Sequence, residues 1–236
     1  CMSYSGRCIL SKWMNNKSAN LGDCTQPCRW KYKTIRDDQE RFGVDVEEDK
    51  HGTYLFNSYD MNLISYIEDL VSAGVASLKI EGRAKSAYYV AVVTRAYRKV
   101  IDAIQNEKTK KSITELITEQ KKELNALVHR GYSTGFFLGK EPEHNFSGKL
   151  QGGNFEFVGE VLKKGGNLNL LKVHNAIKIK DKIEAITPEK NIKIKIKKIF
   201  DNNKQEVKEA HGGHDKNYFF EFDKILPKRS LIRKIK

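Results

Sequence analysis

The chain has 236 residues, enough for one large domain or two ordinary ones, and 31% of them are charged. Its 39% hydrophobic content indicates a globular protein, and no apolar run approaches the ~18 residues of a membrane span, so no membrane partner is expected. The clustered cysteines, described next, favour the cytoplasm. The net charge of +13 is uneven, because residues 151–236 hold 20 Lys and Arg against 11 Asp and Glu. This excess predicts a polyanion-binding C-terminal part, although a lysine-rich solvated surface explains it equally well.

All four cysteines lie near the start of the chain, at Cys1, Cys8, Cys24 and Cys28. Four thiolates that converge on one point suit a zinc site or an iron–sulfur cluster. Only the pair Cys24 and Cys28 has the short spacing of a zinc knuckle, so the spacing favours a cubane iron–sulfur cluster. Zinc and two disulfides remain as alternatives. Clustered cysteines in an otherwise cysteine-free chain also indicate a reducing compartment.

Strand and helix patterns alternate after the cysteines. Residues 33–50 are charged and without period, which indicates a loop, and His51–Phe56 is predicted as a short strand. A helix is expected after the cap Asn57-Ser58, with apolar residues at helical spacing, and Gly74 is placed to end it.

A second strand and two longer helices complete this part. Val75–Ile80 is predicted as a strand, and Ser86–Gln105 as a helix with a continuous apolar stripe. Ser112 and Glu115 form a capping box at the start of the third helix. Alternating strands and helices predict an α/β fold, which is either a barrel or a doubly wound sheet. We expect residues 1–140 to form part of a (β/α) barrel with the cysteine site as an insertion.

The last third is predicted to be all β. Residues 141–153 change in composition and indicate a linker to a domain over 154–236. Five β-rich segments are separated by turn residues, namely Phe155–Lys163, Leu168–Val173, Ile177–Ile186, Ile192–Phe200 and Tyr218–Phe222. Short strands at this spacing predict a small closed β-barrel.

Lysines alternate with apolar residues along two of these segments, which places the lysines on the outer face. We expect the two rows to lie side by side and to bind RNA phosphates, without base specificity. The candidate RNA-binding residues are Lys178, Lys180, Lys182, Lys193, Lys195 and Lys197.

Charged side chains gather at the end of the predicted strand Val75–Ile80. Lys79 and Glu81 are two residues apart and therefore on one side, and Arg83 follows. The C-terminal ends of barrel strands carry active sites, and a guanidinium suits bidentate capture of carboxylate or phosphate. An ordinary salt bridge is the structural alternative.

Two further groups are weaker candidates. Asp49 and His51 lie in the run EEDKH and could form a metal site or an acid–base pair, although charged loops are usually only solvated. Tyr88, next to Tyr89, could stack on a base, although aromatic pairs on helices more often belong to a core.

Three stretches in order give the chain a family resemblance. CMSYSGRCILSKWMNNKSANLGDCTQPCRWKY at Cys1–Tyr32, EEDKHGTYLFNSYD at Glu47–Asp60 and SLKIEGRAKSAYYVA at Ser77–Ala91 resemble the collagenase-like peptidase family U32. Within it they are similar to the prephenate-dependent tRNA uridine-34 hydroxylases. The resemblance runs over almost the whole chain.

The resemblance implies 5-hydroxylation of wobble uridine 34 in tRNA, with prephenate as co-substrate and a 4Fe–4S cluster on the four cysteines. It strengthens Asp49, His51 and Asn57, because the family's E-D-x-x-G-T…N-S run is reproduced. It also suits Arg29, Lys79 and Arg83 as ligands of prephenate carboxylates or tRNA phosphate. The candidate catalytic residues are then Asp49, His51, Lys79, Glu81 and Arg83, and the candidate substrate-binding residues Arg29, Asn57 and Tyr88.

Members of that family begin well upstream with part of an α/β barrel and carry a C-terminal β-barrel. The chain starts without Met at the first cysteine, so we expect it to be a C-terminal portion whose partner is the missing N-terminal half of the same barrel. Two other functions stay open. One is a collagenase-like peptidase, for which the sequence has no Gly-x-Ser-x-Gly elbow. The other is a non-catalytic RNA-binding module with a structural metal.

Overall fold

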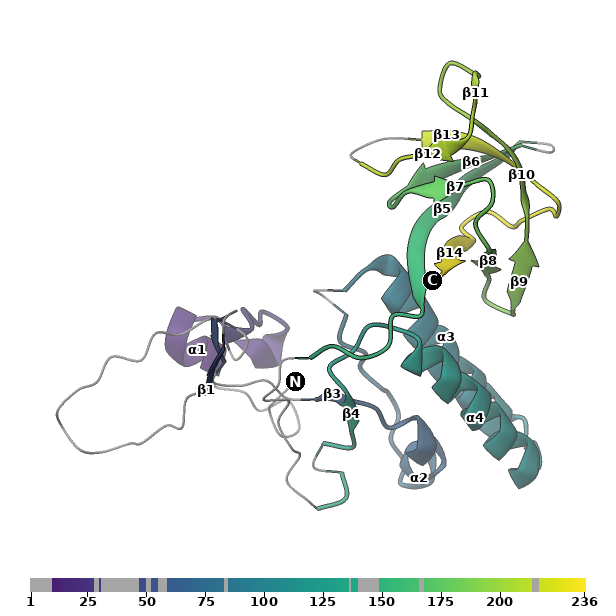
Figure 1. Cartoon of the computed structure of the whole chain (residues 1–236). Helices are drawn as coiled ribbons and strands as arrows, with labels where there is room; N and C mark the ends of the chain where they lie inside the picture. The colour runs from purple at the N-terminus through teal and green to yellow at the C-terminus, as the bar shows by residue number, and fades with distance from the viewer. Residues whose placement is uncertain are drawn as a thin grey trace. The chain divides into compact units, whose positions relative to one another are not determined.

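The computed structural model describes residues 10–27, 30, 47–49, 52–54, 59–82, 85–135, 137–139, 149–165, 168–213 and 217–236. The chain divides into two compact units: unit 1 comprises residues 1–81 and 128–151, and unit 2 comprises 82–127 and 152–236. The two long helices therefore belong with the C-terminal sheet in unit 2 (Figure 1), whereas the sequence placed them in a domain over 1–140.

Unit 1 is built from short elements. They are α1 (Leu10–Asn15), the 3-10 helix η2 (Ala19–Leu21), β1 (Glu47–Asp49), β2 (Gly52–Tyr54), β3 (Asp60–Met61), the 3-10 helix η4 (Ile64–Tyr66), α2 (Ile67–Ser72) and β4 (Tyr132–Ser133). β1 and β2 pair antiparallel, so the predicted loop 33–50 contains a strand, and the strand predicted after it is confirmed at β2.

The helix expected after Asn57-Ser58 starts later than the sequence indicated. Both cap residues lie outside the described residues, and the helical stretch opens with η4 at Ile64. Gly74 follows its end with a φ of +78° and donates its N–H to the carbonyl of Val71 at 3.0 Å. The left-handed conformation is the one that glycine adopts at least cost, so this end of the helix was predictable.

β3 and β4 form the one parallel pair among the described strands. Parallel strands require a crossover connection, and the chain between these two passes through helices. That connection is the repeating unit of an α/β barrel. The pair supports the partial barrel, which stays a prediction.

The strand predicted at Val75–Ile80 is wrong. These residues have no regular structure, and Val75 and Leu78 are 42% and 37% exposed. A strand needs a hydrogen-bonding neighbour, and no strand in the described part of the chain pairs with this segment.

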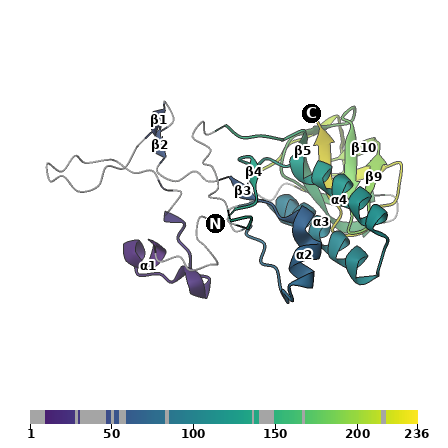
Figure 2. The same ribbon diagram turned by 90° about the horizontal axis from the view of Figure 1, so that it is seen from below.

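The two long helices of unit 2 are α3 (Ala87–Gln105) and α4 (Lys110–Asn125), which run side by side (Figures 1 and 2). The Ser86 hydroxyl accepts the Tyr89 N–H and caps α3, and the predicted apolar stripe is buried. α4 begins earlier than the predicted capping box, because the Thr109 hydroxyl accepts the Ser112 N–H and Ser112 falls inside the first turn.

The rest of unit 2 is a curled, eight-stranded antiparallel sheet in the order β11-β10-β13-β6-β5-β14-β8-β9. Its strands are β5 (Phe155–Gly165), β6 (Leu168–Val173), β8 (Ile183–Ile186), β9 (Asn191–Ile194), β10 (Ile196–Phe200), β11 (Glu206–Val207), β13 (Asn217–Phe222) and β14 (Leu231–Ile235). β7 (Ile177–Lys178) and β12 (Glu209–Ala210) form a separate pair.

Three of the predicted β segments are confirmed as β5, β6 and β13, and two are split. The segment Ile177–Ile186 divides into β7 and β8, which belong to different sheets. The segment Ile192–Phe200 breaks at Lys195 into β9 and β10. β9 is one edge of the sheet and β10 lies next to the other edge, so the predicted closed barrel is a curled sheet with two edges.

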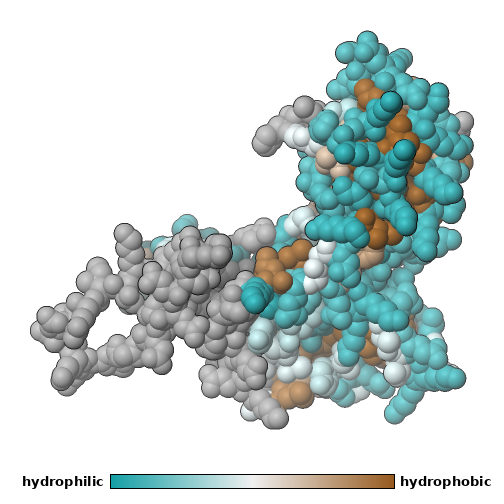
Figure 3. All heavy atoms as spheres, in the orientation of Figure 1, coloured by the Kyte–Doolittle hydropathy of each residue, from teal (hydrophilic) through white to brown (hydrophobic). Residues whose placement is uncertain are grey.

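The sheet curls around an apolar core. Its fully buried side chains include Leu171, Ile199, Phe220 and Ile232. Hydrophilic side chains cover most of the visible face of unit 2, with hydrophobic ones between them (Figure 3). None of the described helices combines the length and the apolar character that crossing a membrane requires.

Candidate functional site

The described part of the cysteine region centres on the thiol of Cys24. Its Sγ accepts hydrogen bonds from the Ser11 hydroxyl at 3.6 Å and from the Gln26 backbone N–H at 3.4 Å. Hydrogen bonds to ligand sulfurs are among the interactions by which proteins orient metal-bound cysteines and tune iron–sulfur clusters. This surrounding therefore fits a metal-bound cysteine.

Local hydrogen bonds hold that thiol in place. Ser11 is fully buried on α1, and its hydroxyl accepts the Thr25 N–H at 3.2 Å. The Asn15 side chain donates to the Thr25 hydroxyl at 2.7 Å, and the Trp30 indole donates to the Thr25 carbonyl at 3.1 Å. These bonds tie α1 to the turn that carries Cys24.

The other proposed ligands, Cys1, Cys8 and Cys28, lie outside the described residues, as does Arg29. Within the ranges that are described, no three His, Cys, Asp or Glu side chains come together as a metal site. The shared four-cysteine cluster therefore stays a prediction.

The described residues do not show the candidate catalytic side chains at the end of Val75–Ile80 gathered in one cluster. Lys79 and Glu81 are exposed in irregular chain, and Arg83 lies outside the described residues. Asp49 is placed by its backbone on β1, whereas His51 and Asn57 are not described. Their catalytic and substrate-binding roles stay predictions.

Sequence reasoning missed an ion pair in unit 1 between Asp60 and Arg130. The Arg130 Nε and Nη2 donate to Asp60 Oδ1 at 3.1 and 2.6 Å, and the Arg130 backbone N–H donates to Oδ2 at 3.0 Å. Asp60 is 9% exposed at the start of β3, and the Arg130 segment leads into β4. Three donors on one carboxylate fix the parallel strand pair. Asp60 ends the second family stretch, which was the available signal.

A buried polar network in unit 2 was also missed. Arg233 on β14 is 1% exposed, and all five of its N–H donors are used. It donates to Glu184 Oε2 at 2.8 and 3.1 Å, to both carboxylate oxygens of Glu123 at 3.0 and 3.1 Å, and to the Tyr88 hydroxyl at 3.2 Å. Its Cζ lies 3.6 Å from the Phe155 ring centroid. Arg95 adds a contact to Glu123 at 3.3 Å, so the network joins α3 and α4 to the sheet.

The charged groups of this network shift one another's pKa values. Burial alone would raise the pKa of Glu123, but hydrogen bonds and charge from Arg233, with Asn191 and Arg95, lower it below its ordinary value. Burial alone would lower the pKa of Arg233, but its hydrogen bonds to Glu123, Tyr88 and Glu184 raise it. Burial lowers the pKa of Arg95, and among the groups that lower the pKa of Glu123, Arg233 has the largest effect.

Tyr88 lies in this core. Its side chain is 6% exposed, and its ring stacks on Phe157 with centroids 5.5 Å apart. Burial raises the pKa of the Tyr88 hydroxyl. A ring covered in this way offers no face to a base, which matches the core alternative of the sequence interpretation.

The six candidate RNA-binding lysines are all exposed, but they do not form two parallel rows. Lys178 lies on β7 and pairs with Glu209 at 3.7 Å, whereas Lys193 lies on β9. Ile183 pairs with Ile194, so the next residues outward, Lys182 and Lys195, are neighbours. Lys180 lies in the turn after β7, and Lys197 on β10 pairs with Glu221 at 3.9 Å.

Comparison with known proteins places both parts of the chain. Residues 1–146 match the profile of "Peptidase family U32" and residues 153–233 that of "Peptidase family U32 C-terminal domain". The chain is 32% identical to tRNA hydroxylation protein P of Haemophilus influenzae, over 91% of this chain and 56% of that protein. It is 43% identical to a 23S rRNA 5-hydroxycytidine synthase of Escherichia coli, over 46% of this chain and 16% of that protein.

Among solved structures, the C-terminal domain of a Geobacillus thermoleovorans U32 peptidase is 25% identical, with a TM-score of 0.32. The match covers 34% of this chain and 93% of that one. The chain spans about half the length of the curated relatives it matches.

Proposed function

The chain belongs to peptidase family U32, and from this we propose that it is part of an enzyme that hydroxylates RNA. The observation that carries the proposal is that two relatives, matched over different shares of the chain, are both named for hydroxylation of an RNA. We propose further that the product is 5-hydroxyuridine at position 34 of tRNA, with prephenate as co-substrate.

Cys24 has a defined role in this proposal. With Cys1, Cys8 and Cys28 it would hold a 4Fe–4S cluster, and the two hydrogen bonds to its Sγ are of the kind that support a ligand sulfur. Such a cluster supplies one-electron transfer when it is bound. Ser11 and Thr25 keep the sulfur oriented, which is the part of the site that this chain's own hydrogen bonds perform.

The anionic co-substrate requires cationic ligands. We propose that Arg83, with Lys79 and Arg29, binds prephenate carboxylate or tRNA phosphate, and that Glu81, Asp49, His51 and Asn57 complete that site. A planar guanidinium makes two parallel hydrogen bonds to a carboxylate, and an ammonium cannot replace that geometry. Arg83→Lys in the full-length enzyme should therefore lose nearly as much activity as Arg83→Ala, and a Lys variant with the wild-type rate would contradict the bidentate contact.

The experiment that tests the function is nucleoside analysis of tRNA from the source organism with the gene deleted. We expect 5-hydroxyuridine and its derivatives at position 34 to disappear and to return on complementation with the full-length gene. Unchanged tRNA nucleosides would contradict the proposal.

Metal content separates the alternatives. Iron in anaerobically purified protein supports the hydroxylase, and zinc favours a non-catalytic RNA-binding module with a structural metal. A collagenase-like peptidase without either metal would require peptide cleavage by the purified full-length protein.

A further inference from the structure

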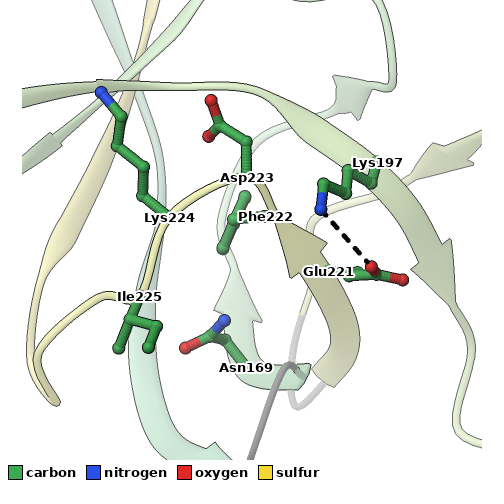
Figure 4. A pocket seen from close by; sticks show the side chains of 7 residues that line it. All are labelled: Asn169, Lys197, Glu221, Phe222, Asp223, Lys224 and Ile225. Carbon is green, nitrogen blue, oxygen red and sulfur yellow. Dashed lines mark ion pairs between the residues drawn. The ribbon is translucent and has the colours of Figure 1, made fainter.

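A small hollow in unit 2 lies beside the break between β9 and β10. It has a volume of about 120 Å³ and is lined by Asn169, Lys197, Glu221, Phe222, Asp223, Lys224 and Ile225 (Figure 4). The wall residues Glu221 to Ile225 come from the end of β13 and the turn after it, whereas Asn169 comes from β6. The predicted lysine row of Lys193, Lys195 and Lys197 runs past this place, but nothing in the sequence indicates the hollow itself.

An unpartnered polar atom lies at this hollow. Asn169 is 3% exposed, and its Oδ1 has no hydrogen-bond partner among the described residues. Buried amide oxygens are nearly always paired, because an unpaired one loses its bonds to water without replacement. Ile225 lines the same hollow as Asn169 (Figure 4) and is 68% exposed, so its side chain can move at little packing cost. A ligand with an N–H donor would satisfy this oxygen.

A basic corner next to the hollow comprises Lys193, Lys195 and Lys224, of which Lys224 also lines the hollow. The Lys195 N–H donates to Asp223 Oδ1 at 2.7 Å, and the Asp223 N–H donates back to the Lys195 carbonyl at 3.0 Å. The Lys224 Nζ donates to the Lys193 carbonyl at 2.8 Å. These three bonds hold the strand break and the turn together, so the backbone of Lys193 and of Lys195 stays beside the turn that carries Lys224, and all three side chains are exposed.

The acidic groups at the hollow are occupied. Glu221 forms an ion pair with Lys197 at 3.9 Å, and Asp223 accepts the Lys195 N–H. The corner therefore presents a surplus of positive charge beside a partly apolar hollow with Phe222 and Ile225 in its walls. Single-stranded nucleic-acid sites likewise combine cations for the phosphates with a neighbouring contact for a base.

We propose that the hollow binds one base of a single-stranded RNA segment, whose phosphates contact Lys193, Lys195 and Lys224. The base donates an N–H to Asn169 Oδ1 and packs against Ile225. The inference rests on the proposed function for the class of substrate, and it names the surface that binds it. Every unpaired, unmodified base offers an N–H donor, so this contact selects unpaired bases rather than one sequence.

The test measures binding of the full chain to a fluorescent single-stranded oligouridylate by anisotropy over a range of salt. Replacing Lys193, Lys195 and Lys224 together with Gln should weaken binding and reduce the salt slope by about two units, as expected for three lost contacts to a single strand. The matched control replaces the exposed lysines of α4, Lys110, Lys111 and Lys121, with Gln, which removes the same amount of charge. Equal effects of both triple variants would contradict RNA binding at the basic corner.

Asn169→Leu tests the hollow itself. We expect about fivefold weaker binding, the value of one hydrogen bond, with an unchanged salt slope and no loss of thermal stability, because an unpaired oxygen is removed. Asn217→Leu is the control, since Asn217 Oδ1 also has no hydrogen-bond partner within the described parts of the chain but lies at the other end of β13. Wild-type affinity in Asn169→Leu would overturn the base contact.

A second variant keeps the proposal testable if Asn169→Leu does not fold. Ile225 is largely exposed, so Ile225→Asp should fold, place a negative charge at the hollow and weaken oligouridylate binding at least fivefold. Unchanged binding would overturn the site. If tRNA nucleosides depend on the gene while these variants bind normally, the proposed function stands and this site fails. If the hollow binds RNA while deletion leaves tRNA unchanged, the reverse holds.

Discussion

At the scale of single residues, the least predictable feature is the buried arginine of β14. In the sequence LIRKI, Arg233 and Lys234 interrupt the apolar pattern, so no strand was predicted there. Arg233 is nevertheless buried, because two carboxylates from α4 and β8 and the Tyr88 hydroxyl meet it. The partners lie 49 to 145 positions away in sequence, and no local pattern announces such a meeting.

Glu123→Gln tests that network while keeping the shape of the side chain. It removes the charge that faces both Arg233 and Arg95, and breaking a buried pair costs about 3–5 kcal/mol in the free energy of unfolding. Denaturant unfolding followed by circular dichroism measures the loss. Glu115→Gln, at an exposed position of the same helix, is the control and should change stability by less than about 0.5 kcal/mol. Equal losses would contradict the network.

The same carboxylate predicts a pH dependence. Because the pKa of Glu123 is lowered in the folded chain, its ionised form contributes stability above the unfolded value of 4.5. That contribution is lost as the pH falls below 4.5 through the folded pKa. We expect Glu123→Gln to lack this part of the acid destabilisation, and an unchanged acid slope in the variant would argue against it.

At the scale of elements, periodicity predicted α3 and most of α4, as well as β5, β6 and β13. Periodicity missed the break at Lys195, because the alternation of isoleucine and lysine continues through it. The chain passes there from β9, at one edge of the sheet, to β10, which lies next to the other edge. Lys195 is fixed by Asp223, a contact made 28 residues away. Strand ends of this kind depend on tertiary partners rather than on local pattern.

The backbone of Gly152 lies close against the carbonyl groups at the end of α4. Its φ is +75°, and a Cβ there would lie 2.0 Å from the Leu127 carbonyl oxygen and 2.6 Å from that of Asn125. Gly152→Ala should therefore lower the free energy of unfolding by more than about 3 kcal/mol, a backbone clash added to left-handed strain. Gly74→Ala, with a φ of +78° and open space, should cost only about 1–2 kcal/mol. Similar costs at both positions would contradict the close approach.

At the scale of the whole molecule, the family boundary and the packing boundary differ. The family profiles divide the chain between residues 146 and 153, close to the predicted linker. Packing instead assigns α3 and α4 to the sheet unit, because Tyr88, Arg95 and Glu123 are buried against it. The linker at 141–153 stays a prediction from composition, whereas the packing of the two helices depends on long-range contacts that no local pattern indicates.

The two tryptophans allow unit 1 to be followed by fluorescence separately from unit 2. Trp13 and Trp30 both lie in unit 1, and Trp30 is bonded to the residue after Cys24. We expect Cys24→Ser to change tryptophan fluorescence and bound iron while the circular dichroism transition of unit 2 keeps its midpoint. Fluorescence and circular dichroism shifting together would contradict this division.

The central claim is tested most directly by reconstitution. tRNA from the deletion strain would be incubated with the anaerobically purified full-length enzyme, with and without prephenate, and its nucleosides analysed by mass spectrometry. The account predicts 5-hydroxyuridine at position 34 only with prephenate present, and none with Cys24→Ser. Unmodified uridine 34 after incubation with iron-loaded wild-type enzyme and prephenate would contradict it.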